Sequence, residues 1–167
     1  MSPNEIKTLQ TRRQTERAVL GALLAAPFLV DLPEVRLLRM ADFGAEGHRA
    51  IWRAIRARSD EALPITPAAI RAEMERADSA ELADLAGIAT EPDLNTALVA
   101  LLREAKPDRL RFDATTLRHM GENLQLADRL AEISNEALLW PPTPRSTFCE
   151  ALDALASRFC SPLTEVS

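Results

Sequence analysis

Apolar residues between positions 15 and 55 recur at the spacing of short amphipathic helices. They form three runs, which are Val19, Leu20, Leu23 and Leu24, then Val35, Leu38 and Met40, then Ile51, Trp52 and Ile55. Pro27 separates the first two runs, and the turn-forming sequence Asp42-Phe43-Gly44 separates the last two. The pattern predicts three short helices joined by tight turns.

Proline and capping side chains predict where these helices begin and end. Residues 1–14 are polar and are expected to form an arm, so that Thr15 caps the first helix and Pro27 ends it. Pro33 suits the first position of the second helix. The expected ranges are from Thr15 to just before Pro27, from Pro33 to Met40 and from Gly47 to Arg58.

Three further helices are expected between residues 66 and 106. Thr66 followed by Pro67 is typical of a helix start. Ser79 is a candidate cap for the next helix, and Pro107 ends the one after it. The positions expected to be buried are Ile70 and Met74, then Leu82, Leu85 and Ile88, then Leu94, Leu98, Leu101 and Leu102.

The C-terminal third of the chain has a different pattern. From Asp113 to Trp140, apolar and small residues alternate at intervals of three and four, which is typical of a helix that packs along another helix. A proline-rich turn follows at residues 141–144, and the pattern resumes from Arg145 to Phe159. An antiparallel helical hairpin is therefore predicted. The expected organisation is a helical head at 1–112, a hairpin at 113–160 and a tail at 161–167.

A two-helix hairpin has too little core to be stable alone, so it is expected to dock on the head or to pair with another copy as a dimer or larger oligomer. Its apolar and aromatic residues are the candidate protein interface, because such side chains concentrate binding energy. They are Leu117, Met120, Leu124, Leu130, Ile133, Trp140, Phe148 and Leu152.

Composition favours an all-α fold. The 167 residues include no Tyr and only 5 Gly, and 47% are hydrophobic. The net charge of −5 argues against a general grip on nucleic acid, although Arg49, Arg53 and Arg56 share a helix face that is a candidate weak nucleic-acid surface. Neither a signal peptide nor an apolar run of membrane-spanning length is present, so we expect a cytoplasmic protein without membrane contact.

No catalytic, cofactor-binding or metal-binding motif is visible. A phosphate-binding loop needs glycine followed by lysine, and none of the glycines is followed by lysine. His48 is expected to cap or pack at a helix start, and His119 is expected at the surface of the hairpin. Cys149 and Cys160 lie on one predicted helix, about 16 Å apart along its axis, too far to pair. The expected site therefore has no catalytic residue, cofactor or metal.

Several segments, taken in order, resemble the N-terminal domain of DnaB-type replicative DNA helicases. They are Thr15-Glu16-Arg17-Ala18-Val19-Leu20-Gly21-Ala22-Leu23-Leu24, Ala41-Asp42-Phe43, His48-Arg49-Ala50-Ile51-Trp52-Arg53-Ala54-Ile55, Pro64-Ile65-Thr66 and Ile70-Arg71-Ala72-Glu73-Met74-Glu75-Arg76. The resemblance continues through residues 82–88 and the predicted hairpin at 113–159.

This resemblance implies an all-helical, non-catalytic domain that pairs through its hairpin in the collar of a helicase ring. It implies replicative helicase, primase or a helicase loader as partners, with nucleic acid contacted only indirectly. A primase's helicase-binding domain and a stand-alone helicase loader or inhibitor are related alternatives. A small helical DNA-binding regulator is the alternative of another class.

The chain departs from the family pattern in three places. The motor domain with its nucleotide loop does not follow, so the chain is either a piece of a longer helicase or a stand-alone protein, which the start at Met1 slightly favours. Residues 91–112 resemble an insertion before the hairpin. Gly44, Glu46 and Gly47 replace the bulkier turn usual before the His-Arg pair.

Overall fold

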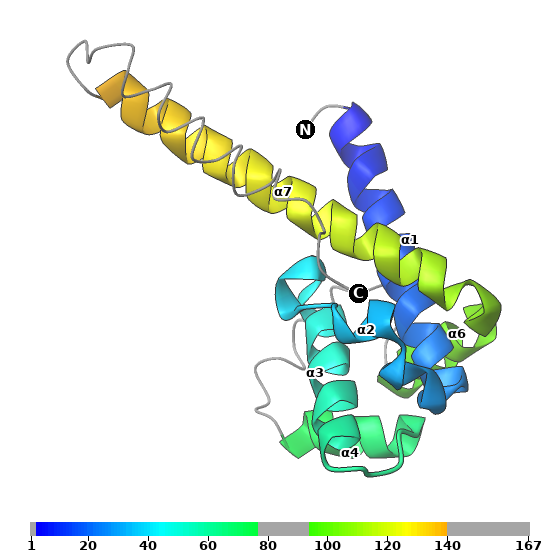
Figure 1. Cartoon of the computed structure of the whole chain (residues 1–167). Coiled ribbons are helices and arrows are strands. Elements are labelled where there is room, and N and C mark those ends of the chain that lie inside the picture. Colours follow the sequence, from blue (N-terminus) through cyan, green and yellow to red (C-terminus); the bar gives the residue numbers. More distant parts are fainter. Residues whose placement is uncertain (1–2, 77–93, 140–167) are drawn as a thin grey trace, which may run out of the picture. The chain divides into compact units, whose positions relative to one another are not determined.

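The computed structural model of this chain describes residues 3–76 and 94–139, and all regular structure within these ranges is helical (Figure 1). The predicted all-α class is confirmed. Within the same ranges, no helix combines the length and the apolar character needed to cross a membrane.

The first helix, α1 (Pro3–Ala25), begins earlier than expected. The prediction of an arm capped by Thr15 is wrong for residues 3–14, because the Thr15 hydroxyl donates to the Thr11 carbonyl oxygen at 3.0 Å within a continuous helix. Residues 3–14 contain good helix formers and no internal proline or glycine, so polarity alone did not mark a helix boundary. The C-terminal half of α1 is buried, and the helix ends before Pro27, as predicted.

Short helical turns connect α1 to the next long helix. They are the 3₁₀ helix η1 (Pro27–Asp31), α2 (Pro33–Arg36) and the 3₁₀ helix η2 (Met40–Asp42). The second helix starts at Pro33 as predicted but ends at Arg36 rather than Met40. Its last turn tightens, with the Leu38 N–H donating to the Val35 carbonyl, and Arg39 then adopts an extended conformation.

The helix α3 (Glu46–Asp60) matches its predicted position and buried face. Ile51 and Ile55 are fully buried, and Trp52 is 2% exposed. The Trp52 ring stacks on Phe43 with the centroids 5.4 Å apart, which packs the turn after η2 against the helix.

The helix α4 (Pro67–Arg76) also follows the prediction. The Ala69 N–H donates to the Thr66 hydroxyl oxygen at 3.2 Å, so Thr66 caps the helix start. Ile70 and Met74 are buried as expected.

The helix α6 (Leu94–Glu104) packs directly on α1. Leu98 and Leu101 are buried as predicted. A Cβ at Gly21 would collide with the Leu101 carbonyl oxygen, so the two helix backbones come close enough to require glycine.

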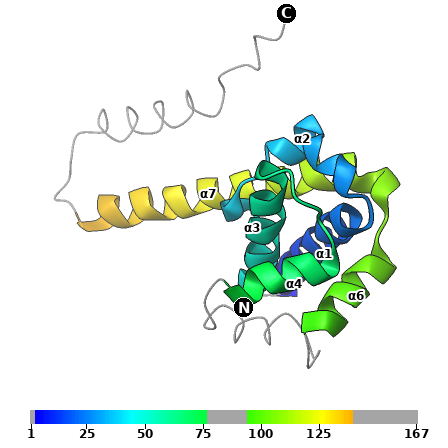
Figure 2. The same ribbon diagram turned by 90° about the horizontal axis from the view of Figure 1, so that it is seen from below.

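The long helices of the head surround one core. α1 contacts α3 and α6, and α4 contacts α3 and α6, which closes a ring of four helices (Figure 2). After η3 (Pro107–Arg109), the final described helix α7 (Leu110–Leu139) begins. Its residues Leu110, Ala114 and Leu117 are fully buried in the same core.

The chain divides into two compact units, Met1–Leu124 and Gln125–Ser167. The first unit includes the beginning of α7, which was expected to belong to the hairpin. The predicted helix at residues 79–88 and the second hairpin helix at 145–159 lie outside the described residues.

Candidate interaction site and its buried polar anchor

A buried hydrogen bond between two side chains joins α1 to the start of α3. Glu16 is fully buried and His48 is 2% exposed, and His48 Nδ1 lies 2.6 Å from Glu16 Oε2. The other carboxylate oxygen accepts the Gly44 N–H at 2.7 Å, and the Ala45 N–H donates to Oε2 at 3.4 Å. Both oxygens of Glu16 therefore have donors, as a buried carboxylate requires.

These donors also determine the acidity of Glu16. Burial alone would raise the pKa of the carboxyl group, but the hydrogen bonds from His48 and from the Gly44 N–H outweigh it and hold the pKa below its usual value. The charged form of Glu16 is thus the form that fits the folded head.

Arg12 ties the same region of α1 to the turn before α3. Its guanidinium donates to the carbonyl oxygens of Ala41 at 3.2 Å and Asp42 at 2.8 Å. Its Nε lies 3.2 Å from Glu16 Oε1. Glu16, His48 and Arg12, together with the turn at residues 41–45, form a unit that we call the polar anchor.

Asp42 is buried less favourably than Glu16. One carboxylate oxygen accepts the Arg39 N–H at 2.7 Å, whereas the other, Oδ1, has no hydrogen-bond partner in the described structure and lies 3.6 Å from the Arg39 guanidinium. Burial is the largest cause that raises the pKa of Asp42 above its usual value, and the Glu122 carboxylate adds to it. The charged form of Asp42 is therefore the costly one.

The polar anchor organises the fold and offers no reactive group to solvent. Glu16 and His48 are buried and Arg12 is partly buried, and Glu16 and Arg12 bind backbone amides and carbonyls of the head. Among the described residues, no group of three or more His, Cys, Asp or Glu side chains could hold a metal ion. His48 packs at the start of α3 as expected, and the side chain of His119 is 59% exposed.

The predicted interface residues have different environments. Leu117 is fully buried in the head core, so it serves that core rather than the surface of this chain. Met120 and Ile133 are half-buried, while Leu124 is 36% and Leu130 is 40% exposed. The remaining candidates, Trp140, Phe148 and Leu152, lie outside the described residues.

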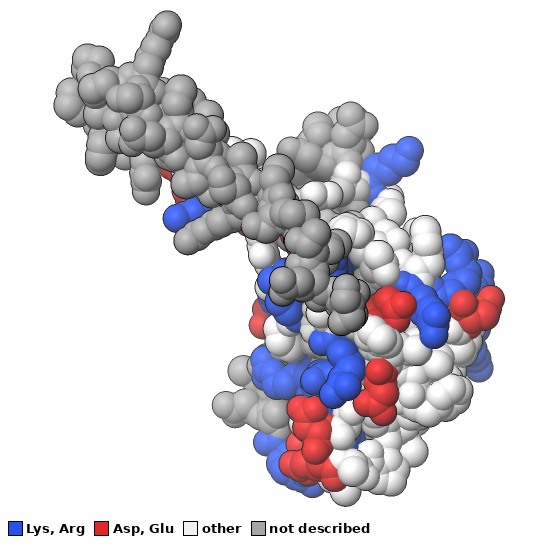
Figure 3. Space-filling view, viewed as in Figure 1, with Lys and Arg blue, Asp and Glu red and all other residues white. Residues whose placement is uncertain are grey.

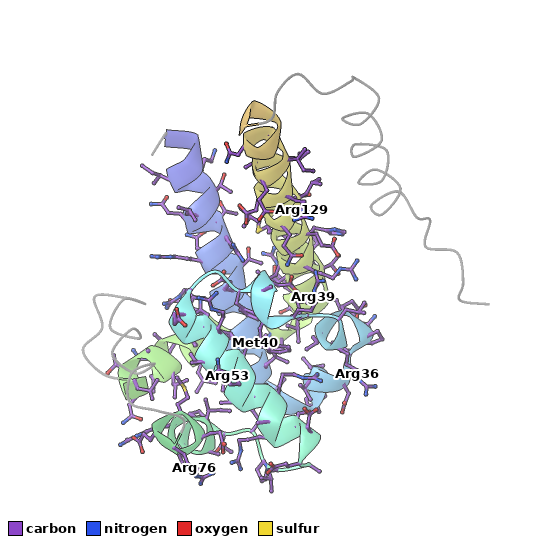
Figure 4. The ribbon with its side chains drawn as sticks, turned by 90° about the vertical axis from the view of Figure 1, so that its left-hand side faces the viewer. Arg36, Arg39, Met40, Arg53, Arg76 and Arg129 are labelled. Carbon is purple, nitrogen blue, oxygen red and sulfur yellow. The ribbon has the colours of Figure 1, made fainter. Side chains whose placement is uncertain are left out.

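The predicted arginine face on α3 exists, but acidic side chains accompany it. Arg49 pairs with Glu46 at 3.1 Å, and Arg56 pairs with Asp60 at 3.5 Å. Arg53 is exposed on the same helix (Figure 4). Basic and acidic side chains also alternate across the face of the head in Figure 3. This mixture lacks the continuous positive potential that a phosphate backbone attracts.

Sequence reasoning missed Arg12, Asp42 and Gly121 as members of one arrangement. Glu16 and Asp42 belong to two of the segments that resemble the helicase family, and this resemblance was the one sequence signal that could have indicated their importance. Arg12 gave none, because it was assigned to a polar arm. Gly121 gave none either, because its contact with Asp42 joins residues far apart in the sequence.

Comparison with known families gives one match. A model described as the DnaB-like helicase N-terminal domain matches residues 8–106, which run from α1 through α6. The match includes the whole polar anchor. No curated protein and no solved structure matches the chain.

Proposed function

Because the matched segment is more than half of its length, the chain belongs to the DnaB-like helicase N-terminal domain family, and we propose that it oligomerises through residues 113–160 and docks replication proteins. The family's domain is non-catalytic and is a protein-interaction domain of replication. The proposed partners are a second copy of this chain and a replicative helicase, primase or helicase loader.

The observation that carries the proposal is the apolar character of α7 beyond the head. Leu124 and Leu130 are exposed on a helix whose earlier residues Leu110 and Leu117 are fully buried. Leu124 continues the seven-residue spacing of Leu110 and Leu117, whereas Leu130, six residues further on, lies on a different side of the helix. Exposed leucines on a long helix are typical of helices that pair with another helix. Residues 125–167, the second compact unit, supply the chain for such a pairing.

The oligomeric state tests the first half of the proposal. Size-exclusion chromatography with light scattering is expected to show a dimer or larger species for the wild type. Leu130→Glu is expected to shift it to monomer, because the charge must be buried in the helix pairing. Asp128→Asn is the matched control, since it changes charge at an exposed position of the same helix without removing apolar surface. A wild-type monomer at high concentration contradicts self-association.

Partner capture tests the second half. Immobilised wild-type chain is expected to bind cognate helicase, primase or loader with a Kd on the order of micromolar, as for transient replication contacts. Binding to helicase alone would favour the loader, inhibitor or primase-domain alternatives. Absence of binding to all of these proteins contradicts the docking proposal. A mobility-shift assay over a salt series tests the DNA-binding alternative, in which Arg49, Arg53 and Arg56 would contact phosphates.

A further inference from the structure

The helix α7 approaches the buried carboxyl group of Asp42 at Gly121, in its fourth turn. A Cβ at Gly121 would lie 3.0 Å from the Asp42 Cα and 3.1 Å from its Cγ, and closer still to Oδ1. Glycine therefore allows α7 to approach the η2 turn more closely than any other residue could. The contact joins elements that are distant in sequence and lies wholly within the first compact unit.

The groups around Asp42 leave one of its oxygens unsatisfied. The Arg39 N–H donates to Oδ2, and the Arg39 guanidinium lies 3.6 Å from Oδ1 (Figure 4). Arg12 donates to the backbone carbonyl oxygen of Asp42 and not to its carboxylate. From α7, Arg118 and Glu122 face Asp42 with opposite charges. Arg118 Nε lies 3.3 Å from Glu122, so these two side chains neutralise each other.

Within the polar anchor, the carboxylate of Asp42 is satisfied less completely than that of Glu16. Glu16 has donors on both oxygens, whereas Asp42 presents a bare oxygen to the backbone of α7 at Gly121. A buried carboxylate with an incomplete set of donors costs free energy when it is charged. The strength of the contact at Gly121, beyond the last core residue Leu117, therefore depends on the charge of Asp42.

We propose that the contact between Asp42 and Gly121 is a charge-sensitive latch, which holds residues 118–124 of α7 on the head and releases them while Leu110, Ala114 and Leu117 stay in the core. Neutralising Asp42 strengthens the latch, and filling the space at Gly121 opens it. One consequence of the latch rests on the proposed function. Because α7 carries Leu124 and Leu130, release of the latch would change how these proposed interface residues are exposed to a partner.

Hydrogen exchange of the full-length chain, measured by mass spectrometry at neutral pH, tests the latch directly. Gly121→Ala is expected to raise exchange of amides in residues 118–124 about tenfold, because overpacking against the η2 backbone must displace this part of α7. Exchange in α3 is expected to stay unchanged. Asn123→Ala is the matched control, because it makes the same kind of gain in helix propensity at an exposed position of α7.

Asp42→Asn tests the charge dependence with a second variant. The amide oxygen of asparagine can still accept the Arg39 N–H, and the buried charge is removed, so exchange in residues 118–124 is expected to slow about threefold. This arm stays decisive even if Gly121→Ala does not fold.

Three results would overturn the latch. They are unchanged or slower exchange of residues 118–124 in Gly121→Ala, a uniform rise of exchange across the head in that variant when it folds, and unchanged or faster exchange of residues 118–124 in Asp42→Asn. None of these measurements involves a partner or an oligomer, so the latch and the proposed function can fail separately.

Discussion

Glu16 and Asp42 show how the surroundings of a carboxyl group decide whether its charge stabilises a fold. Both side chains are fully buried in the same small region. Glu16 is surrounded by His48 and two backbone N–H groups, and its pKa is lowered. Asp42 lacks a donor for one oxygen, and its pKa is raised. The number of donors, and not the depth of burial, distinguishes them.

Glu16→Gln is expected to destabilise the head at neutral pH by about 2 kcal/mol, the usual value for hydrogen bonds to a charged group. The pKa of Glu16 is lowered in the folded state, so its contribution is present above the unfolded pKa and is lost as the pH falls through the folded pKa. Urea unfolding between neutral pH and pH values below the usual carboxyl range checks this. The wild type should lose stability on acidification, and the variant should lose less.

Gln14→Ala is the control for that experiment, because Gln14 is exposed on the same helix. An equal acid dependence in the wild type and in Glu16→Gln would mean that other carboxyl groups dominate the pH response and that the polar anchor contributes little.

At the scale of elements, local signals predicted what local interactions determine. The cap at Thr66, the proline at the start of α4 and the buried stripe of α3 all depend on residues within a few positions of each other, and all were found in the structure. The length of α1 was missed because its first half lacks an apolar face although its residues favour helix. The close approach of Gly21 to α6 was missed because the sequence holds no record of which helices meet.

Thr66→Ala is expected to cost about 1 kcal/mol of stability, because the Ala69 N–H loses its acceptor at the start of α4. Thermal unfolding followed by circular dichroism measures the loss. Thr66→Ser keeps the hydroxyl and should remain close to the wild type. If both variants lose the same stability, the effect arises from the methyl group of threonine and the cap is not the cause.

For the whole molecule, the candidate site was predicted less completely than the fold. The hairpin pattern correctly indicated a long helix with exposed leucines, but the same pattern ran into the head, where Leu117 is buried in the core. Periodicity identifies an apolar stripe without saying whether the chain's own helices or another protein cover it. That distinction depends on tertiary packing, which changes along α7 between Leu117 and Leu124.

A chain that ends at Leu124 is expected to fold as a monomer, because the described core residues extend no further along α7 than Leu117 and the first compact unit ends at Leu124. Trp52 is the only tryptophan in this shorter chain, and its stacking on Phe43 makes its fluorescence a report on the head alone. Its emission and unfolding midpoint should match those of the full chain carrying Trp140→Phe, while light scattering should show no oligomer. An unfolded fragment would mean that residues 125–167 supply part of the head core. A fragment that remains oligomeric would place the self-association surface on the head itself and would remove the second unit from the proposed interface.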